Sequence, residues 1–142
     1  MFEQVLDQQQ LELIDRLNQY DAFASAYYLA GGTGLALHVG HRKSQDLDFF
    51  APGDFYVDET REVINSLGGS VMVAESGTVH AVIDSVKISV LRYTFPLLQS
   101  LESWRGIRVA SIPDIVCMKC VAVAQRSQRC ANELLERYFD EE

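Results

Sequence analysis

The sequence predicts an α+β domain in which a β-sheet is flanked by helices. Three observations support this prediction: helically spaced apolar residues near the N-terminus, β-rich segments between residues 71 and 93, and a strongly capped helix beginning at Ser111. A length of 142 residues fits a single domain over 1–142. The expected order is helix, strand, turn, helix, strand, helix, several strands, helix.

The first half of the chain alternates helical and extended patterns. Apolar residues among Gln, Glu and Asp predict an amphipathic helix over about 3–18. The run Tyr27–Ala30 is typical of a buried strand entering a tight turn, and Thr33–Val39 of a short helix. A further helix is expected over Asp58–Leu67, and the following glycine pair should end it.

The second half is β-rich and then helical. Strands are predicted, with Asp84 and Ser85 as a hairpin turn, at Val71–Ala74, Val79–Ile83, Val86–Tyr93 and Gly106–Ala110. Ser111 as N-cap and Pro113 in the first turn predict a helix to about Arg126. A short final helix is expected over Asn132–Phe139, as part of a shortened C-terminal helical tail.

Composition limits the function classes. The net charge of −8 argues against a protein that coats nucleic acid through a general basic surface. A local cluster of His38, His41, Arg42 and Lys43 could either face phosphates or form a solvated turn, and the sequence leaves both open.

Cysteine content and hydropathy predict a cytoplasmic protein with no membrane partner. Three cysteines suit a reducing compartment, and the Cys117–Cys120 pair lacks a second metal-binding pair, so we expect buried small hydrophobes there. No apolar run approaches the roughly 20 residues that span a bilayer. The N-terminal segment lacks the basic and apolar regions of a signal peptide.

A glycine pair and two aspartates form the motif most relevant to chemistry. Gly31 and Gly32 are followed, after 13 residues, by Asp46 and Asp48. Side chains at i and i+2 of a strand share a face, so these two carboxylates can bind one Mg2+ together with substrate phosphates. The alternative is a charged strand face with Leu47 and its apolar neighbours packed inside.

Other residues supply what a bound triphosphate needs. The backbone N–H groups of Gly31, Gly32 and Thr33, with the Thr33 hydroxyl, could hold phosphate oxygens at a helix start. Lys119 could neutralise charge from the helix that begins at Ser111. The set predicts a nucleotidyl-transfer site.

Four segments resemble the AbiEii/AbiGii-type nucleotidyltransferase toxins of bacterial toxin–antitoxin and abortive-infection systems, which are part of the DNA polymerase β-like superfamily. They are LAGGTGLALHVGHRKSQDLDFF, VKISVLRYTFPLL, GIRVASIPDIVCMK and AVAQR, within about Tyr27 to Arg129. The resemblance implies a polymerase β-type core with a mixed β-sheet. It also implies Mg2+- or Mn2+-dependent transfer from an NTP to an acceptor such as tRNA, and a cognate antitoxin as partner.

The resemblance also assigns roles to residues. The catalytic set it implies is Asp46, Asp48 and Lys119, with the two aspartates as metal ligands. The implied nucleotide-binding set consists of the glycine motif, the Arg-x-Ser before the aspartates and the acid of Asp-x4-Lys: Gly31, Gly32, Thr33, Arg42, Ser44 and Asp114.

Two departures from the family pattern raise an alternative function. Ser89 stands where many relatives place a third carboxylate, and Asp84 is either its substitute or a solvated turn residue. After Arg129 the expected acid is absent, and Glu133 and Glu136 could equally form a wet helix face. The alternative is a catalytically degenerate protein that binds nucleotide or a protein partner. We expect His80 to be structural.

Overall fold

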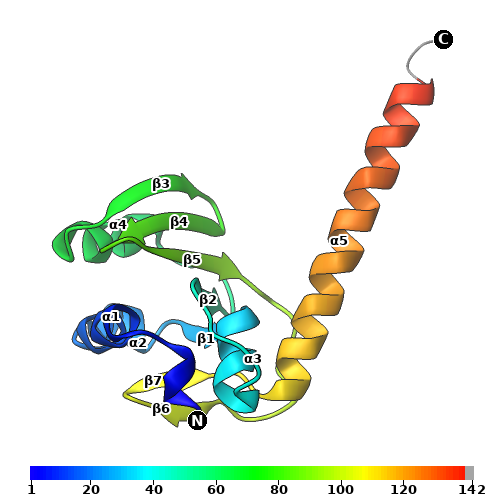
Figure 1. Cartoon of the computed structure of the whole chain (residues 1–142). Coiled ribbons are helices and arrows are strands. Elements are labelled where there is room, and N and C mark those ends of the chain that lie inside the picture. The colour runs from blue at the N-terminus through cyan, green and yellow to red at the C-terminus, as the bar shows by residue number, and fades with distance from the viewer. Residues whose placement is uncertain (140–142) are drawn as a thin grey trace.

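The computed structural model describes residues 1–139 of the chain, which form one mixed sheet with helices on both faces (Figure 1). The elements in order are η1 (Glu3–Val5), α1 (Gln8–Asn18), α2 (Asp21–Ala24), β1 (Tyr28–Ala30), α3 (Gly31–Val39), β2 (Leu47–Ala51), α4 (Val57–Ser66), β3 (Ser70–Glu75), β4 (Thr78–Ile83), β5 (Val86–Arg92), β6 (Glu102–Trp104), β7 (Ile107–Val109) and α5 (Ile112–Phe139).

Seven strands follow the order β3-β4-β5-β2-β1-β7-β6. The pairs β2/β5 and β1/β7 are parallel, whereas β1/β2, β3/β4, β4/β5 and β6/β7 are antiparallel. The sheet is therefore mixed, as the sequence analysis expected. The central position of β1 and β2 brings the glycine motif and the aspartates onto neighbouring strands.

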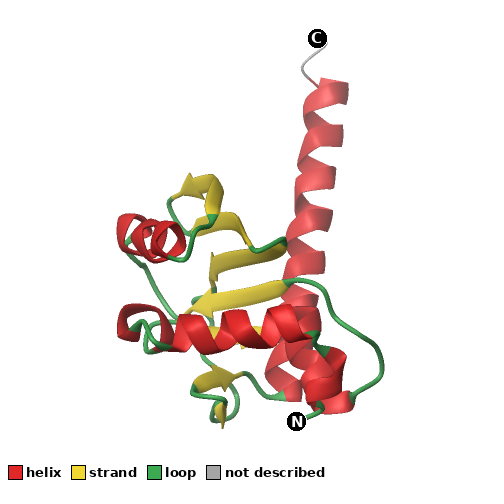
Figure 2. Cartoon of the chain, turned by 60° about the vertical axis from the view of Figure 1, so that its left-hand side comes forward, coloured by secondary structure: helices red, strands yellow, loops and turns green. Residues whose placement is uncertain are grey.

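The two faces of the sheet are covered unequally. One face packs against α1, α2 and α4 in a large core that includes Ile14, Phe23 and Ile64. On the other face a smaller cluster joins Tyr28 and Ala30 to Ile115 and Met118 of α5. Only the first turns of α5 take part, and the helix continues well past the sheet (Figures 1 and 2). Side chains of β4 and β5 that point to this second face are half-buried or exposed, whereas those on the first face are buried, so part of the second face is left open beside α5.

Local sequence signals explain most element boundaries. Asp7 and Gln10 form a capping box at the start of α1, with reciprocal 2.8 Å bonds between side chain and backbone N–H. The Asp84 and Ser85 backbones both have positive φ, +50° and +67°, which suits a tight two-residue hairpin turn. Ser111 caps α5, its Oγ accepting the Asp114 N–H at 3.2 Å.

Several expectations need correction. The N-terminal helix expected over 3–18 is interrupted, because the Asp7 capping box starts a new helix after η1. The two C-terminal helices are one continuous helix, since no Gly or Pro separates Arg126 from Asn132. Cys120 is exposed and Cys117 half-buried, so this pair does not form the buried hydrophobic contact we expected.

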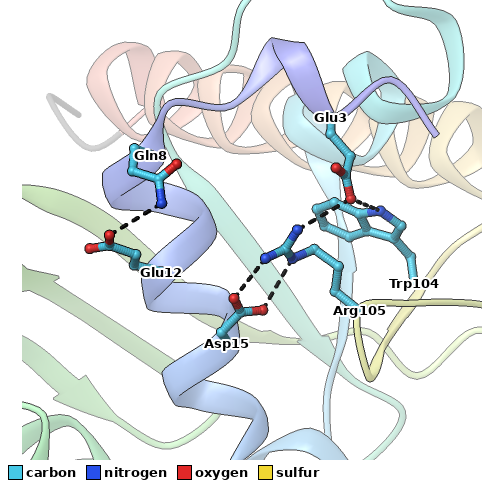
Figure 3. A network of polar contacts seen from close by, with 6 residues as sticks. All are labelled: Glu3, Gln8, Glu12, Asp15, Trp104 and Arg105. Carbon is cyan, nitrogen blue, oxygen red and sulfur yellow. Dashed lines mark hydrogen bonds and ion pairs between the residues drawn. The ribbon is translucent and has the colours of Figure 1, made fainter.

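The β6–β7 hairpin includes a strand, β6, that the sequence analysis did not predict. Its turn residue Arg105 reaches back to the N-terminal helices, bonding Asp15 at 2.6 Å and Glu3 at 3.3 Å (Figure 3). The Trp104 indole N–H donates to the same Glu3 carboxylate at 3.1 Å. Three residues are too few to give a strand pattern, and long-range pairing defines this strand instead.

Candidate active site

Asp46 and Asp48 lie at the start of β2 and line one cavity of about 390 Å3 with Gly32, Arg42 and Lys119. Asp48 is the cross-strand partner of Ala30, the last residue of β1. Its side chain therefore projects toward the point where β1 turns into α3. We call this cavity the carboxylate pocket.

Both glycines of the motif are in close contact with side chains of the carboxylate pocket. Gly31 has φ +64°, and a Cβ placed there would lie 2.7 Å from Asp48 Oδ2. A Cβ at Gly32 would lie 2.5 Å from Arg42 Nη2. The helix expected from Thr33 in fact begins at Gly31, so the glycines form its first turn, where backbone N–H groups lack intrahelical partners. The first turn of α3 thus lies directly against a carboxylate and a guanidinium group.

The electrostatics of the pocket favour a bound cation. Burial raises the pKa of Asp48, the nearby Asp46 carboxylate raises it further, and His80 opposes the rise. Two neighbouring carboxylates repel each other when both are ionised, and a cation between them reduces that repulsion. Two carboxylates with phosphate oxygens also match the ligand set that Mg2+ prefers, so the residues present fit the metal ion.

Thr33 and Ser44 hold a loop instead of presenting free hydroxyl groups to the pocket. Both are buried, and Thr33 Oγ1 bonds to Ser44 Oγ and to the Asp46 carbonyl. The third member of this arrangement, Gln10, was not predicted from the sequence. Its side-chain amide donates to the Ser44 and Gln45 carbonyls at 2.8 and 2.9 Å. A polar residue among the apolar positions of α1 was the only signal for it. These residues fix the segment that carries Arg42 and Asp46.

The side chains of Lys119 and Asp114 lie in different parts of the structure, although both residues belong to the Asp-x4-Lys motif. Lys119 lines the carboxylate pocket. Asp114 is buried outside it and accepts the Leu98 N–H at 2.7 Å, the Gln99 N–H at 3.1 Å and the Ser111 hydroxyl at 2.8 Å. Burial alone would raise its pKa, but these hydrogen bonds outweigh burial and lower it. Asp114 therefore anchors the loop that precedes β6.

A second cavity, of about 660 Å3, continues from the first between the sheet and α5. The two share Gly32 and Lys119, and we call the second one the α5 groove. Six of the 12 Lys and Arg residues line the two cavities: Arg42, Lys43, Arg92, Lys119, Arg126 and Arg129. Among the acids of residues 1–139, only Asp46 and Asp48 do so. Of the basic cluster before the aspartates, Arg42 and Lys43 thus reach the site, but His38 bonds the Ala110 carbonyl instead.

The open face of the sheet extends the site beyond Asp48. Ser89 of β5 is the cross-strand partner of Asp48, and His80 of β4 is the next partner in the same row. His80 Nδ1 lies 2.8 Å from Ser89 Oγ. Asp84, the proposed substitute acid, is at the hairpin turn and forms an ion pair with Arg16 of α1 at 2.7 Å, so it belongs to another part of the surface.

Comparison with known proteins identifies the family of this chain. A model described as "Nucleotidyl transferase AbiEii toxin, Type IV TA system" matches residues 12–102, more than half of the chain. The chain belongs to the AbiEii nucleotidyltransferase toxin family. The matched range contains the glycine motif, both aspartates and Ser89, and it stops before Asp114 and Lys119.

One sequence relative and two solved structures illustrate the similarity. The protein aq_aa25 of Aquifex aeolicus (strain VF5) is 36% identical over 108 residues, which cover 72% of this chain and 52% of the relative. The chain thus spans about half the length of that relative. The crystal structure of ANT(2")-Ia with adenylyl-2"-tobramycin has a TM-score of 0.58 at 18% identity, covering 82% of this chain and 78% of that one. JHP933 from Helicobacter pylori has a TM-score of 0.53 at 18% identity, with coverage of 80% and 57%.

A structure described as a putative nucleotidyltransferase from Thermotoga maritima has a TM-score of 0.62 at 10% identity, covering 92% of this chain and 96% of that one. These similarities confirm the nucleotidyltransferase-like fold that the sequence predicts. Within the described part of the chain, no helix combines the length and the hydropathy needed to cross a bilayer.

Proposed function

We propose that this AbiEii family member is a divalent-metal-dependent nucleotidyltransferase that transfers a nucleotide from an NTP to an RNA acceptor such as tRNA. The observation that supports this most strongly is the contact between Asp48 and the first turn of α3, with Arg42 and Lys119 lining the same pocket. Carboxylates, unpaired N–H groups and cations are the three groups that a metal-bound triphosphate requires.

In this proposal the residues of the carboxylate pocket have separate roles in binding the metal ion and the triphosphate. Asp46 and Asp48 would hold Mg2+ or Mn2+, which supplies positive charge to the triphosphate oxygens. The N–H groups of Gly31 and Gly32 bind phosphate oxygens at the positive end of α3. Arg42 and Lys119 stabilise the charge that develops as pyrophosphate leaves. Thr33 and Ser44 position the segment that carries Arg42 and Asp46, whereas Asp114 anchors the loop before β6 outside the pocket.

The α5 groove supports a polyanionic acceptor. It continues from the carboxylate pocket and is lined by Arg92, Arg126 and Arg129 in a chain whose net charge is −8. Concentrated cations beside aromatic side chains such as Tyr93 and Phe95 suit a single-stranded RNA end, with phosphates on the arginines and a base against a ring. As a toxin-type enzyme the protein would act beside a cognate antitoxin.

Label transfer tests the proposal. Purified protein is incubated with each of four α-labelled NTPs, Mg2+ or Mn2+, and total tRNA. Asp48→Asn is the inactive variant. Asp58→Asn, an exposed aspartate on α4 at the opposite face of the sheet, is the matched control. Tobramycin, the acceptor portion of the adenylylated ligand in the ANT(2")-Ia structure, serves as a polycationic comparator that we expect to remain unlabelled.

The outcomes separate the two functions considered for this chain. Labelled RNA that requires Asp48 and tolerates Asp58→Asn supports the enzyme. Nucleotide binding without transfer to any acceptor favours the degenerate alternative. That alternative is motivated by Ser89, which stands in place of a third carboxylate as the cross-strand partner of Asp48.

A further inference from the structure

Transfer of a nucleotide to a hydroxyl group leaves one proton to be removed, because the attacking oxygen loses its hydrogen as it bonds to the α-phosphorus. In the function proposed above, on which this inference rests, Asp46 and Asp48 are occupied with the cation. Among residues 1–139 no third His, Cys, Asp or Glu side chain joins this pair in a group that could hold a metal ion, so the pair has no spare member to accept the proton. A proton acceptor therefore has to stand outside the metal-binding pair.

One row of side chains crosses the open face of the sheet and ends in such a group. Asp48, Ser89 and His80 are successive cross-strand partners on β2, β5 and β4. Neighbouring strands are about 4.8 Å apart, so His80 lies roughly 10 Å along the sheet from Asp48, with Ser89 between them. The imidazole is half-buried and is fixed on one side by the 2.8 Å contact between Nδ1 and Ser89 Oγ.

The neighbouring row of the same face forms the floor of the α5 groove. Phe50, Leu91 and Thr78 are cross-strand partners on the same three strands, two residues along from Asp48, Ser89 and His80. All three line the α5 groove. An acceptor lying in the groove consequently has the row from Asp48 to His80 along its edge.

We propose that His80 accepts the proton of the acceptor hydroxyl, and that Ser89 is the positioning residue that sets its tautomer. The Nδ1–H donates to Ser89 Oγ, which leaves the lone pair on Nε2. The hydroxyl oxygen forms its bond to the α-phosphorus while the bond from that phosphorus to the bridging oxygen breaks. That electron pair leaves with pyrophosphate, the hydroxyl proton moves to Nε2, and the imidazolium then releases the proton to water.

The tautomer is measurable without any activity. Long-range 1H–15N NMR spectra of the full chain report which imidazole nitrogen carries the hydrogen, and only three histidines contribute signals. The His80 signals are identified as those missing from the spectrum of His80→Gln. We expect neutral His80 to carry its hydrogen on Nδ1 and Ser89→Ala to lose that preference. A hydrogen on Nε2 in the wild type would overturn the proposal, because that nitrogen could then accept no proton.

Kinetics provide the second test. His80→Gln is expected to slow label transfer by about 10²- to 10⁴-fold with unchanged nucleotide affinity, as loss of a general base does. Adding Ser89→Asp to His80→Gln should restore transfer, since a carboxylate in the row can accept the proton. Val82→Ala, two residues along the same face of β4, is the control.

The results distinguish this inference from the proposed function. If His80→Gln transfers label at the wild-type rate while Asp48→Asn is inactive, His80 is not the proton acceptor. The proposed nucleotidyltransferase function is then still supported. If the wild type transfers no label to any acceptor, both are overturned. If His80→Gln does not fold, Ser89→Ala and the wild-type tautomer decide the matter.

Discussion

Gly31→Ala offers the sharpest test of the contact between the α3 turn and Asp48. Gly31 has φ +64°, a conformation that costs an L-residue about 1–2 kcal/mol. The added Cβ would also lie 2.7 Å from Asp48 Oδ2, 3.1 Å from its Cβ and 3.3 Å from its Cγ. Rotating the carboxylate alone cannot relieve all three contacts, so the Asp48 side chain has to move as a unit.

Gly68→Ala separates the two effects of that substitution. Gly68 has φ +77°, and a Cβ there meets nothing within 4 Å. In urea titrations Gly68→Ala should therefore lose about 1–2 kcal/mol of unfolding free energy, and Gly31→Ala should lose more because of its additional contacts with Asp48. Only Gly31→Ala should weaken Mn2+–nucleotide binding, by about 10- to 100-fold, the range typical when the support of a metal ligand is disturbed.

Mn2+ electron paramagnetic resonance, which reports the free ion, measures that binding directly. Wild-type affinity in Gly31→Ala would refute the assignment of Asp48 to the metal. Equal loss of affinity in Gly68→Ala would show that general destabilisation, and not the position of Asp48, controls binding.

Two further predictions concern the supports of the site. Gln10→Ala leaves the Ser44 and Gln45 carbonyls without their side-chain donor, so we expect a loss of about 1–3 kcal/mol and faster hydrogen exchange in residues 43–46. Gln8→Ala on the same helix, whose bond to Glu12 is exposed (Figure 3), should change stability by less than about 0.5 kcal/mol; equal effects would contradict a special role for Gln10. The second prediction follows from the raised pKa of Asp48, which is caused first by burial and then by Asp46. A raised folded-state pKa means that the stabilising contribution is present at acid pH and is lost as pH rises through that pKa. Asp48→Asn should therefore stabilise the metal-free protein at neutral pH and flatten its pH dependence above about pH 4 in urea titrations with EDTA. A destabilised Asp48→Asn protein at pH 7 would show that the ionised carboxylate is already satisfied without a cation.

Local sequence patterns predicted most elements because their signals act over a few residues. The hairpin at Asp84 and Ser85, the glycine stop after α4 and the Ser111 cap depend on backbone conformations and hydrogen bonds between near neighbours. Predictions failed where distant contacts decide, as for β6, which exists through its pairing with β7. The one helix α5 was predicted as two, because the polar run at 127–129 suggested a break that no Gly or Pro enforces.

The role of Asp114 likewise depends on contacts between residues that are distant in the sequence. Its place in an Asp-x4-Lys motif led to a nucleotide-binding prediction that stays untested, and the structure places its carboxylate on the backbone of the loop at Leu98 and Gln99. Sequence spacing records that two residues share a helix, but the tertiary packing of that helix decides which one faces a cavity.

The sequence by itself determined the family, the sheet-and-helix class and the pairing of Asp46 with Asp48, because an i, i+2 relation in a strand is a property of covalent geometry. Only the tertiary structure placed Lys119 beside residues more than 70 positions earlier, committed Thr33 and Ser44 to a buried loop, and placed Ser89 beside Asp48. Those placements depend on strand order and register, which follow from how the apolar faces of all the elements bury one another together.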